Sequence, residues 1–181
     1  YILGRPALIE CLSKPDDDLL DRLQRAAFGY FVEHASPRNG LVADTSRPES
    51  PASIAVVGFA LSAYPIGVER GWMTRTEAAA RTLAALRFFW NTQQTEDDDA
   101  TSYKGFYYHF LDMQTGKRVW QSELSLIDTT LLLAGILTAR EFFSSDGQDE
   151  KEIRELADEV YRRVDWQWAL GGAATARQGW K

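Results

Sequence analysis

The chain has very few of the residues that build metal centres and disulfide frameworks. Among its 181 residues there is one cysteine, Cys11, and there are two histidines, His34 and His109. A single cysteine excludes an internal disulfide, and no histidine lies near it in the sequence to activate it as a nucleophile. With so few histidine and cysteine ligands we expect no metal site of the zinc type, and no other feature indicates a cofactor.

Long apolar runs and positive charge are also missing. No stretch approaches the roughly 18 consecutive apolar residues of a membrane span, and the segment from Tyr1 to Pro6 lacks the apolar region and cleavage site of a signal peptide. The net charge is −6 and the isoelectric point is about 5.0. Because nucleic acids and anionic membranes attract basic surfaces, we expect neither as a partner.

Apolar and aromatic side chains, by contrast, are abundant. Hydrophobic residues make up 45% of the chain and charged residues 25%, which is typical of one globular domain with a substantial core. Six tryptophans, seven tyrosines and nine phenylalanines raise the aromatic share to 12%. Aromatic rings fill cores, and they also provide flat surfaces on which sugar rings can stack.

The spacing of apolar residues predicts five helices and one β-hairpin. The first helix begins at Asp16 after an irregular segment over 1–15. A loop over 35–51 separates it from the second helix, for which Ser50 is the expected N-cap and Pro51 the first residue. The other expected elements are a third helix from the capping box Thr74–Glu77 to Trp90, a hairpin over 105–120 turning at 114–116, a fourth helix capped by Ser125, a fifth over 149–168, and a loop over 171–180.

Charge alternates from one predicted helix to the next. The second helix (52–66) has no charged residue and the fourth is nearly free of charge over 131–139, so both should be buried on every side. The first, third and fifth are amphipathic. Buried helices alternating with half-exposed ones predict an all-α fold, an α/α toroid of the (α/α)6 type. It would be present as a partial ring over 16–181.

Two inner helices cannot close such a ring. We therefore expect that the missing walls come from a further part of a longer protein or from another copy of the chain. A helical-repeat solenoid is the competing interpretation, but the sequence shows no fixed repeat length.

A series of motifs connects the chain to a known family. They are Thr45-Ser-Arg-Pro48, Pro51-Ala-Ser-Ile-Ala55, Gly67-Val-Glu-Arg-Gly-Trp72, Gly105-Phe-Tyr-Tyr-His-Phe110, Ser122-Glu-Leu-Ser-Leu-Ile-Asp-Thr129, Val164-Asp-Trp-Gln-Trp168 and Gly179-Trp180. Together they resemble the glycoamylase-like family of bacterial proteins, which includes endo-β-1,2-glucanases, and a related domain of cyclic β-1,2-glucan synthases. The resemblance runs from about residue 16 to the C-terminus and implies an (α/α)6 toroid of twelve helices.

The resemblance also implies a function. Family members hydrolyse β-linked glucan by carboxylate acid/base catalysis without a cofactor, and a periplasmic or other extracytoplasmic location would fit. Such proteins continue past the Gly-Trp motif with further acidic and aromatic cleft residues, so we expect part of the catalytic cleft to be missing here. The alternatives are a non-catalytic glucan-binding module or fragment, and a helical scaffold for protein contacts.

Glycoside hydrolysis requires two carboxyl groups at the scissile bond, one of them protonated. Glu123 is the first candidate, because a helix capped by Ser125 leaves it in the preceding loop beside the apolar Trp120. It could instead face a helix N-terminus or pair with an arginine. Asp128 is either a second catalytic acid or the structural acid of the cap. Within one helix, Glu123 and Asp128 would diverge by about 140°, but that objection does not apply to a residue outside the helix.

The remaining candidates come from loops and aromatic residues. Asp44 could act as an acid or bind sugar hydroxyls, although aspartate also stabilises turns, and Arg47 follows it closely. In the predicted hairpin, strand alternation places Tyr107 and His109 on one face. The expected sugar-binding side chains are Arg47, Tyr107, His109, Trp120, Trp168 and Trp180, and each tryptophan could equally belong to the core.

Overall fold

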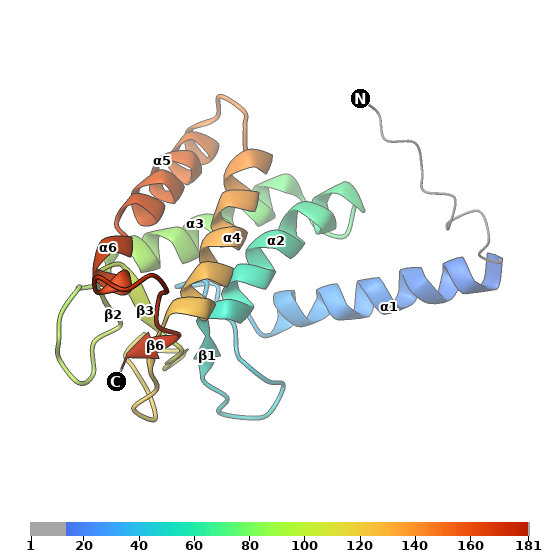
Figure 1. Ribbon diagram of the computed structural model, residues 1–181. Coiled ribbons are helices and arrows are strands. Elements are labelled where there is room, and N and C mark those ends of the chain that lie inside the picture. Colours follow the sequence, from blue (N-terminus) through green and yellow to red (C-terminus); the bar gives the residue numbers. More distant parts are fainter. Residues whose placement is uncertain (1–13, 181) are drawn as a thin grey trace.

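The computed structural model describes residues 14–180, so Cys11 and most of the predicted irregular segment lie outside the described residues. The chain is mainly helical, with two small antiparallel sheets (Figure 1). The helices are α1 (Lys14–Glu33), α2 (Ile54–Glu69), α3 (Arg75–Asn91), α4 (Leu126–Phe142), α5 (Gln148–Arg162) and α6 (Trp166–Leu170). One sheet pairs β1 (Ala52–Ser53) with β4 (Phe110–Leu111), and the other has the order β2 (Ser102–Tyr103), β3 (Phe106–Tyr108), β5 (Leu124–Ser125), β6 (Gly179–Trp180).

The helices form two layers. Helices α2 and α4 lie side by side and make the most extensive helix contact, while α3 and α5 pack against each other and against this pair (Figure 1). The nearly uncharged helices are therefore the inner ones and the amphipathic helices the outer ones. This arrangement confirms the predicted all-α, toroid-like alternation of inner and outer helices. Among the described residues, no helix combines the length and apolarity needed to cross a membrane.

Two glycines bring α2 and α4 into backbone contact. A Cβ atom on Gly135 would lie 2.0 Å from the carbonyl oxygen of Gly58, and one on Gly58 would lie 2.4 Å from the carbonyl oxygen of Leu131. Neither separation is sterically allowed, so any larger residue would force the helices apart. The closeness of the inner layer therefore depends on these two positions.

The inner helices are not buried on every side, as the sequence predicted. Phe59 and Ile66 of α2 are about half exposed, and Ile127 and Leu137 of α4 are also exposed. The prediction was wrong for this face because no described residues cover these side chains. The apolar face of α1 is exposed as well, and the helix extends away from the body (Figure 1).

Several helix boundaries differ from the predicted ones because of tertiary contacts. Helix α2 begins at Ile54 with Ser53 as N-cap, and the predicted cap, Ser50, instead accepts a hydrogen bond from the backbone N–H of Thr45 at 3.0 Å. The reason is that Ala52 and Ser53 pair with β4 and are extended. By contrast, the capping box of Thr74 and Glu77 is confirmed in α3.

The predicted hairpin and fifth helix also differ from the structure. The turn near 114–116 is present, but the strands before it pair with other partners: β3 with β2 and β5, and β4 with β1. The fifth helix breaks at 163–165. Gly105, whose φ is +81°, packs against this break, where a Cβ would lie 2.5 Å from Cα of Val164. Residues 179–180, predicted as loop, form β6.

Ion pairs join α3 to α5, and the one between Arg75 and Glu150 should make stability depend on pH. Nε and Nη2 of Arg75 donate to the Glu150 carboxylate at 2.6 and 2.9 Å, and the N–H of Ser145 donates at 2.8 Å. The hydrogen bonds from Arg75 lower the pKa of Glu150 from 4.5 to about 2, against the opposing effect of burial. Because the folded-state pKa is depressed, the stabilisation is complete above pH 4.5 and is lost as the pH falls towards 2.

We expect Glu150→Gln to lower the free energy of unfolding by about 2 kcal/mol at pH 7, because the charged hydrogen bonds from Arg75 are weakened. The partial exposure of Arg75 keeps this loss moderate. The gap from wild type should shrink as the pH falls from about 4.5 to about 2. Urea unfolding at both ends of this range measures it, with the exposed Glu155→Gln on the same helix as control. A gap that stays constant with pH would contradict the assignment.

Candidate active site

The candidate site lies where the two inner helices begin. Helix α2 follows β1 and α4 follows β5, so both N-termini are at the end of the molecule where the short strands gather (Figure 1). His109 links them through its backbone: its N–H donates to the carbonyl oxygen of Glu123 at 3.0 Å, and its carbonyl oxygen accepts from the N–H of Ile54 at 3.2 Å. The residue between β3 and β4 is thereby held between the starts of α2 and α4.

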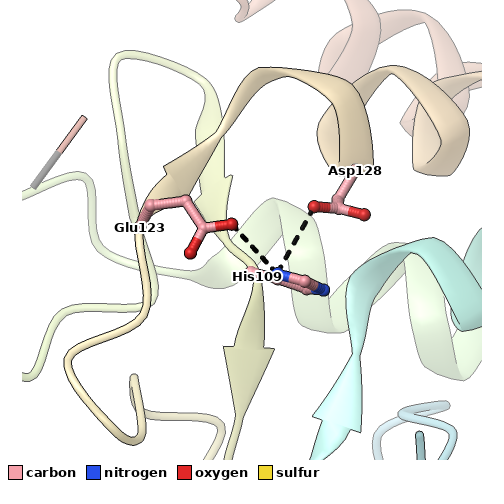
Figure 2. A group of neighbouring side chains, drawn as sticks. All are labelled: His109, Glu123 and Asp128. Atoms are coloured by element: carbon pink, nitrogen blue, oxygen red, sulfur yellow. Dashed lines mark hydrogen bonds and ion pairs between the residues drawn. The ribbon is translucent and has the colours of Figure 1, made fainter. Parts of the chain in front are cut away.

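The side chain of His109 lies between two carboxylates (Figure 2). Its Nδ1 is 3.0 Å from Oε1 of Glu123 and 3.6 Å from Oδ2 of Asp128. Exposure decreases across the group, from 38% for the Glu123 side chain to 26% for His109 and 12% for Asp128. The structure therefore brings three predicted site residues together, with the glutamate outermost.

Asp128 has two interactions, one in the cap and one in this cluster. Ser125 is the N-cap of α4, and its hydroxyl accepts from the N–H of Asp128 at 3.2 Å. The carboxylate of Asp128 in turn accepts from the Ser125 hydroxyl at 2.5 Å, whereas a standard capping box would use the backbone N–H of the cap. The helix N-terminus also favours a negative charge at this position. Asp128 is thus a cap residue that also faces His109.

Strand β6 forms the wall behind Glu123. Leu124 and Ser125 pair with Trp180 and Gly179, respectively. A Cβ atom on Gly179 would lie 3.0 Å from Cγ of Glu123 and 2.9 Å from the carbonyl oxygen of Leu124. The Gly-Trp motif therefore leaves the space that the glutamate side chain occupies. The sequence predicted a loop here, and only the motif marked the position.

We expect Gly179→Ala to displace Glu123 and lower kcat about tenfold, since small misplacements of a reacting group are costly. The matched control is Gly172→Ala, where no atom lies within 4 Å of the added Cβ, although its positive φ makes some strain unavoidable. Kinetics on the β-linked glucan that the sequence motifs lead us to expect as substrate, with circular dichroism to check folding, measures the effect. Unchanged kcat in Gly179→Ala would show that the contact does not position Glu123.

Trp120 is displayed on the surface by an unusual loop. Its side chain is 72% exposed, and both Trp120 and Gln121 have positive φ, at 56° and 51°. Arg118 holds the loop by donating to the carbonyl oxygens of Ser122 and Gln121 at 2.6 and 2.9 Å. The ring of Phe110 contacts Trp120 and stacks on His109 at 3.8 Å between centroids. This exposed indole does not bury Glu123, so the apolar environment expected for that carboxyl group is not provided by Trp120.

Other predicted aromatic ligands belong to the core or its edge. Tyr107 is fully buried, its hydroxyl donates to the carbonyl oxygen of Phe89 at 3.0 Å, and burial raises its pKa to about 12. Tyr107 is therefore a core residue, and its side chain is not accessible for the direct sugar binding that the sequence predicted. Trp168 and Trp180 lie 4.5 Å apart in a cluster with Phe106 and are half-buried. Trp180 adjoins the site through its pairing with Leu124.

Asp44 and Arg47 lie on the loop before β1. The charge of Asp44 acts on Tyr30, whose pKa is raised first by burial and then by this carboxylate. Asp44 is not part of the group formed by His109 and its two carboxylates. Arg47 is exposed, and its backbone groups close the loop through Thr45 and Ser50. Their catalytic and sugar-binding roles remain predictions.

The cluster could also hold a cation. His109, Glu123 and Asp128 each offer one ligand atom, and these atoms lie within 4.8 Å of one another. Within residues 14–180 no other such group is present. A histidine with two carboxylates suits several divalent metals. The sequence led us to expect no metal. Calorimetry with divalent cations and the purified chain can test whether this group binds one.

Comparison with known proteins gives this site a context. No family model matches the chain. An exo β-1,2-glucooligosaccharide sophorohydrolase of Parabacteroides distasonis is 34% identical over an alignment of 160 residues, and the match covers 84% of this chain and 21% of that protein. The solved structure of a β-1,2-glucanase from the same species is 30% identical, with a TM-score of 0.78 over 91% of this chain and 24% of that one. A proposed glucoamylase from Bacteroides uniformis is 28% identical, with a TM-score of 0.81 over 94% of this chain and 40% of that one.

The chain spans about one fifth of its curated relative and less than half of either solved protein. Its similarity nevertheless extends along almost its entire length in both sequence and fold. The resemblance to glycoamylase-like proteins and β-1,2-glucanases that its motifs indicated is confirmed: the chain is a homologue of one part of these α/α-toroid proteins.

Proposed function

We propose that this chain forms one wall of the active site of a glycoside hydrolase that cleaves β-1,2-linked glucan. The observation that supports this most directly is the arrangement of His109 between Glu123 and Asp128 at the start of the inner helices (Figure 2). Two relatives whose names refer to β-1,2-glucans or β-1,2-glucooligosaccharides are 30–34% identical over the aligned residues, and the solved one shares the fold. They motivate the choice of substrate.

In this proposal Glu123 is the general acid. It is the most exposed member of the cluster and the one that a substrate can reach. Its proton passes to the glycosidic oxygen as the bond from that oxygen to C1 of the sugar breaks. His109 orients the carboxyl group through the 3.0 Å contact, and Asp128, fixed by Ser125, lies 3.6 Å from the same imidazole nitrogen, Nδ1.

The second reacting carboxylate is not assigned within this cluster. Glu123 and Asp128 both face Nδ1 of one imidazole, and the ligand atoms of the three residues lie within 4.8 Å of one another, so in this proposal both carboxylates are on the same side of the sugar. The attacking water or nucleophile must approach from the opposite face of the sugar, and its carboxylate must lie across the cleft. Asp44 is the candidate from this chain, and a residue outside it is the alternative.

Hydrolysis of purified β-1,2-glucan tests the proposal. We expect new reducing ends and short glucooligosaccharides, which chromatography can identify, with β-1,3- and β-1,4-glucans as controls for linkage. The second candidate function is non-catalytic glucan binding. The exposed position of Glu123 favours it, because a general acid is usually kept protonated by an apolar, buried environment. Binding without hydrolysis would support it, and absence of both would reject each candidate.

The exposed apolar residues of α2 and α4 favour contact with further protein. Phe59 and Ile127 are each about half exposed on helices whose other faces are buried. Self-association is one way to cover them, and a further part of a longer protein is another. Light scattering of the purified chain distinguishes a dimer from a monomer, and a monomer at micromolar concentration would argue against self-association and against a scaffold of identical copies.

A further inference from the structure

A pocket that does not include the carboxylate cluster lies beside Trp120. It has a volume of about 350 Å³ and is lined by Glu49, Ser50, Asp112, Gln114 and Trp120, among others. Pairing of β1 with β4 explains its position, because Ala52 lies opposite Leu111. The segment before β1 and the turn after β4 are therefore neighbours, and the loop of Trp120 completes the wall.

Strained backbone surrounds this pocket. Four residues other than glycine have positive φ among the described residues, and three of them are at or beside its rim: Glu49, Trp120 and Gln121. Such conformations are unfavourable for residues other than glycine and persist only where other contacts hold them. Here those contacts come from Ser50 and Arg118, whose hydrogen bonds close the two loops. The backbone is thus strained at the residues whose side chains, those of Glu49 and Trp120, it holds in exposed positions.

Both displayed side chains are exposed. Trp120 is 72% exposed and touches only the edge of Phe110 among the described rings, although burying an indole in the core would be more favourable. The carboxylate of Glu49 makes no hydrogen bond or ion pair with the described residues. An aromatic face and a carboxylate held at one rim by strained backbone are consistent with a ligand site.

The chemistry of the lining favours a neutral polyol. The indole offers a flat apolar face, and the Glu49 carboxylate and the Gln114 amide offer hydrogen-bonding groups for hydroxyls. Two carboxylates exclude an anionic ligand. A cation is disfavoured because Oδ1 of Asp112 already accepts bonds from the N–H groups of Gln114 and Thr115. A sugar ring has both the apolar face and the hydroxyls that this lining requires.

A series of side-chain contacts links the pocket to the proposed active site. The ring of Trp120 contacts Phe110, Phe110 stacks on His109, and His109 contacts Glu123. A glucan chain cleaved at Glu123 can therefore extend over this row of rings. We propose that the pocket between Glu49 and Trp120 is a carbohydrate subsite that binds a glucosyl unit away from the scissile bond. The identity of the sugar rests on the proposed function.

Nuclear magnetic resonance can test the subsite without hydrolysis. The indole N–H signals of the ¹⁵N-labelled Glu123→Gln chain are recorded while β-1,2-linked glucopentaose is added, and Trp120→Phe in the same background identifies the Trp120 signal. We expect this signal to shift and saturate. Glu49→Gln and Trp120→Ala should each weaken binding roughly tenfold, the loss of one good polar or stacking contact. Tyr161→Ala, which removes an exposed aromatic ring on α5, should leave affinity unchanged.

The outcomes separate the subsite from the catalytic proposal. If wild-type protein hydrolyses the glucan while the Trp120 signal does not move at saturating sugar, the subsite is rejected and the catalytic assignment stands. If the signal shifts but wild-type protein releases no product, the subsite stands and the catalytic proposal fails. If Tyr161→Ala weakens binding as much as Trp120→Ala does, the effect is not specific to the pocket and the inference is overturned.

Discussion

Replacing Glu123 by glutamine is expected to lower kcat for β-1,2-glucan hydrolysis by about 10²- to 10⁴-fold, the usual contribution of a general acid. The amide retains the shape and the acceptor oxygen that faces Nδ1 of His109 but cannot deliver a proton. KM should change little, because the side chain is not assigned to substrate binding in the ground state. Initial rates of reducing-end release over a range of substrate concentrations measure both constants.

The control for this experiment is Glu155→Gln, the same chemical change at an exposed position on α5. Both variants should unfold within about 0.5 kcal/mol of wild type, as is usual for substitutions outside the core. Hydrolysis at the wild-type rate by Glu123→Gln would remove this residue from the mechanism. A rate loss accompanied by a large fall in stability would instead assign Glu123 a structural role.

The largest effect on stability is expected from Gly135→Ala. Its methyl group would lie 2.0 Å from the carbonyl oxygen of Gly58, and a backbone atom cannot move aside as a flexible side chain can. The inner helices must separate, which loosens the most extensive helix contact in the chain. We expect a loss of about 3 kcal/mol, which corresponds to a fall in Tm of roughly 6–12 °C for a chain of this size.

Gly29→Ala on α1 is the matched control, because the nearest atom to the added Cβ is 3.6 Å away. There alanine should be neutral or stabilise by up to about 1 kcal/mol, as in other exposed helices. Gly58→Ala should resemble Gly135→Ala, and the double variant should be less destabilised than the sum, since both changes open the same contact. A Tm for Gly135→Ala equal to that of wild type would show that the helices do not approach this closely.

The helices could be predicted because their signals are local. The capping box of Thr74 and Glu77 and the serine cap at Ser125 are both present in the structure. The alternation of uncharged and amphipathic helices correctly separated the inner layer from the outer one. These patterns lie within one helix, and burial of the apolar face does not depend on which neighbour covers it.

The short strands could not be predicted in the same way. Ser50 has the residue type of a cap and precedes a proline, yet α2 begins later because Ala52 and Ser53 pair with β4. The fifth helix breaks where Gly105, nearly 60 residues earlier in the chain, packs on Val164. Two-residue strands have no period of their own, so their partners are decided by how the helices dock.

The candidate site shows the same division. Its candidate residues could be proposed from the sequence, because Glu123 precedes a capped helix and the motif around it resembles a known family. Its geometry could not be. His109 meets Glu123 and Asp128 only because β3 pairs with β5 and because the His109 backbone bridges the starts of α2 and α4.

The sequence by itself therefore determined the helical class, the inner and outer layers and the residue types available for catalysis, since these depend on periodicity and on neighbours along the chain. Only the tertiary structure decided that Tyr107 is core, that His109 lies between two carboxylates and that Gly179 makes room for Glu123. Each of these depends on contacts between segments far apart in the chain, which local patterns do not encode.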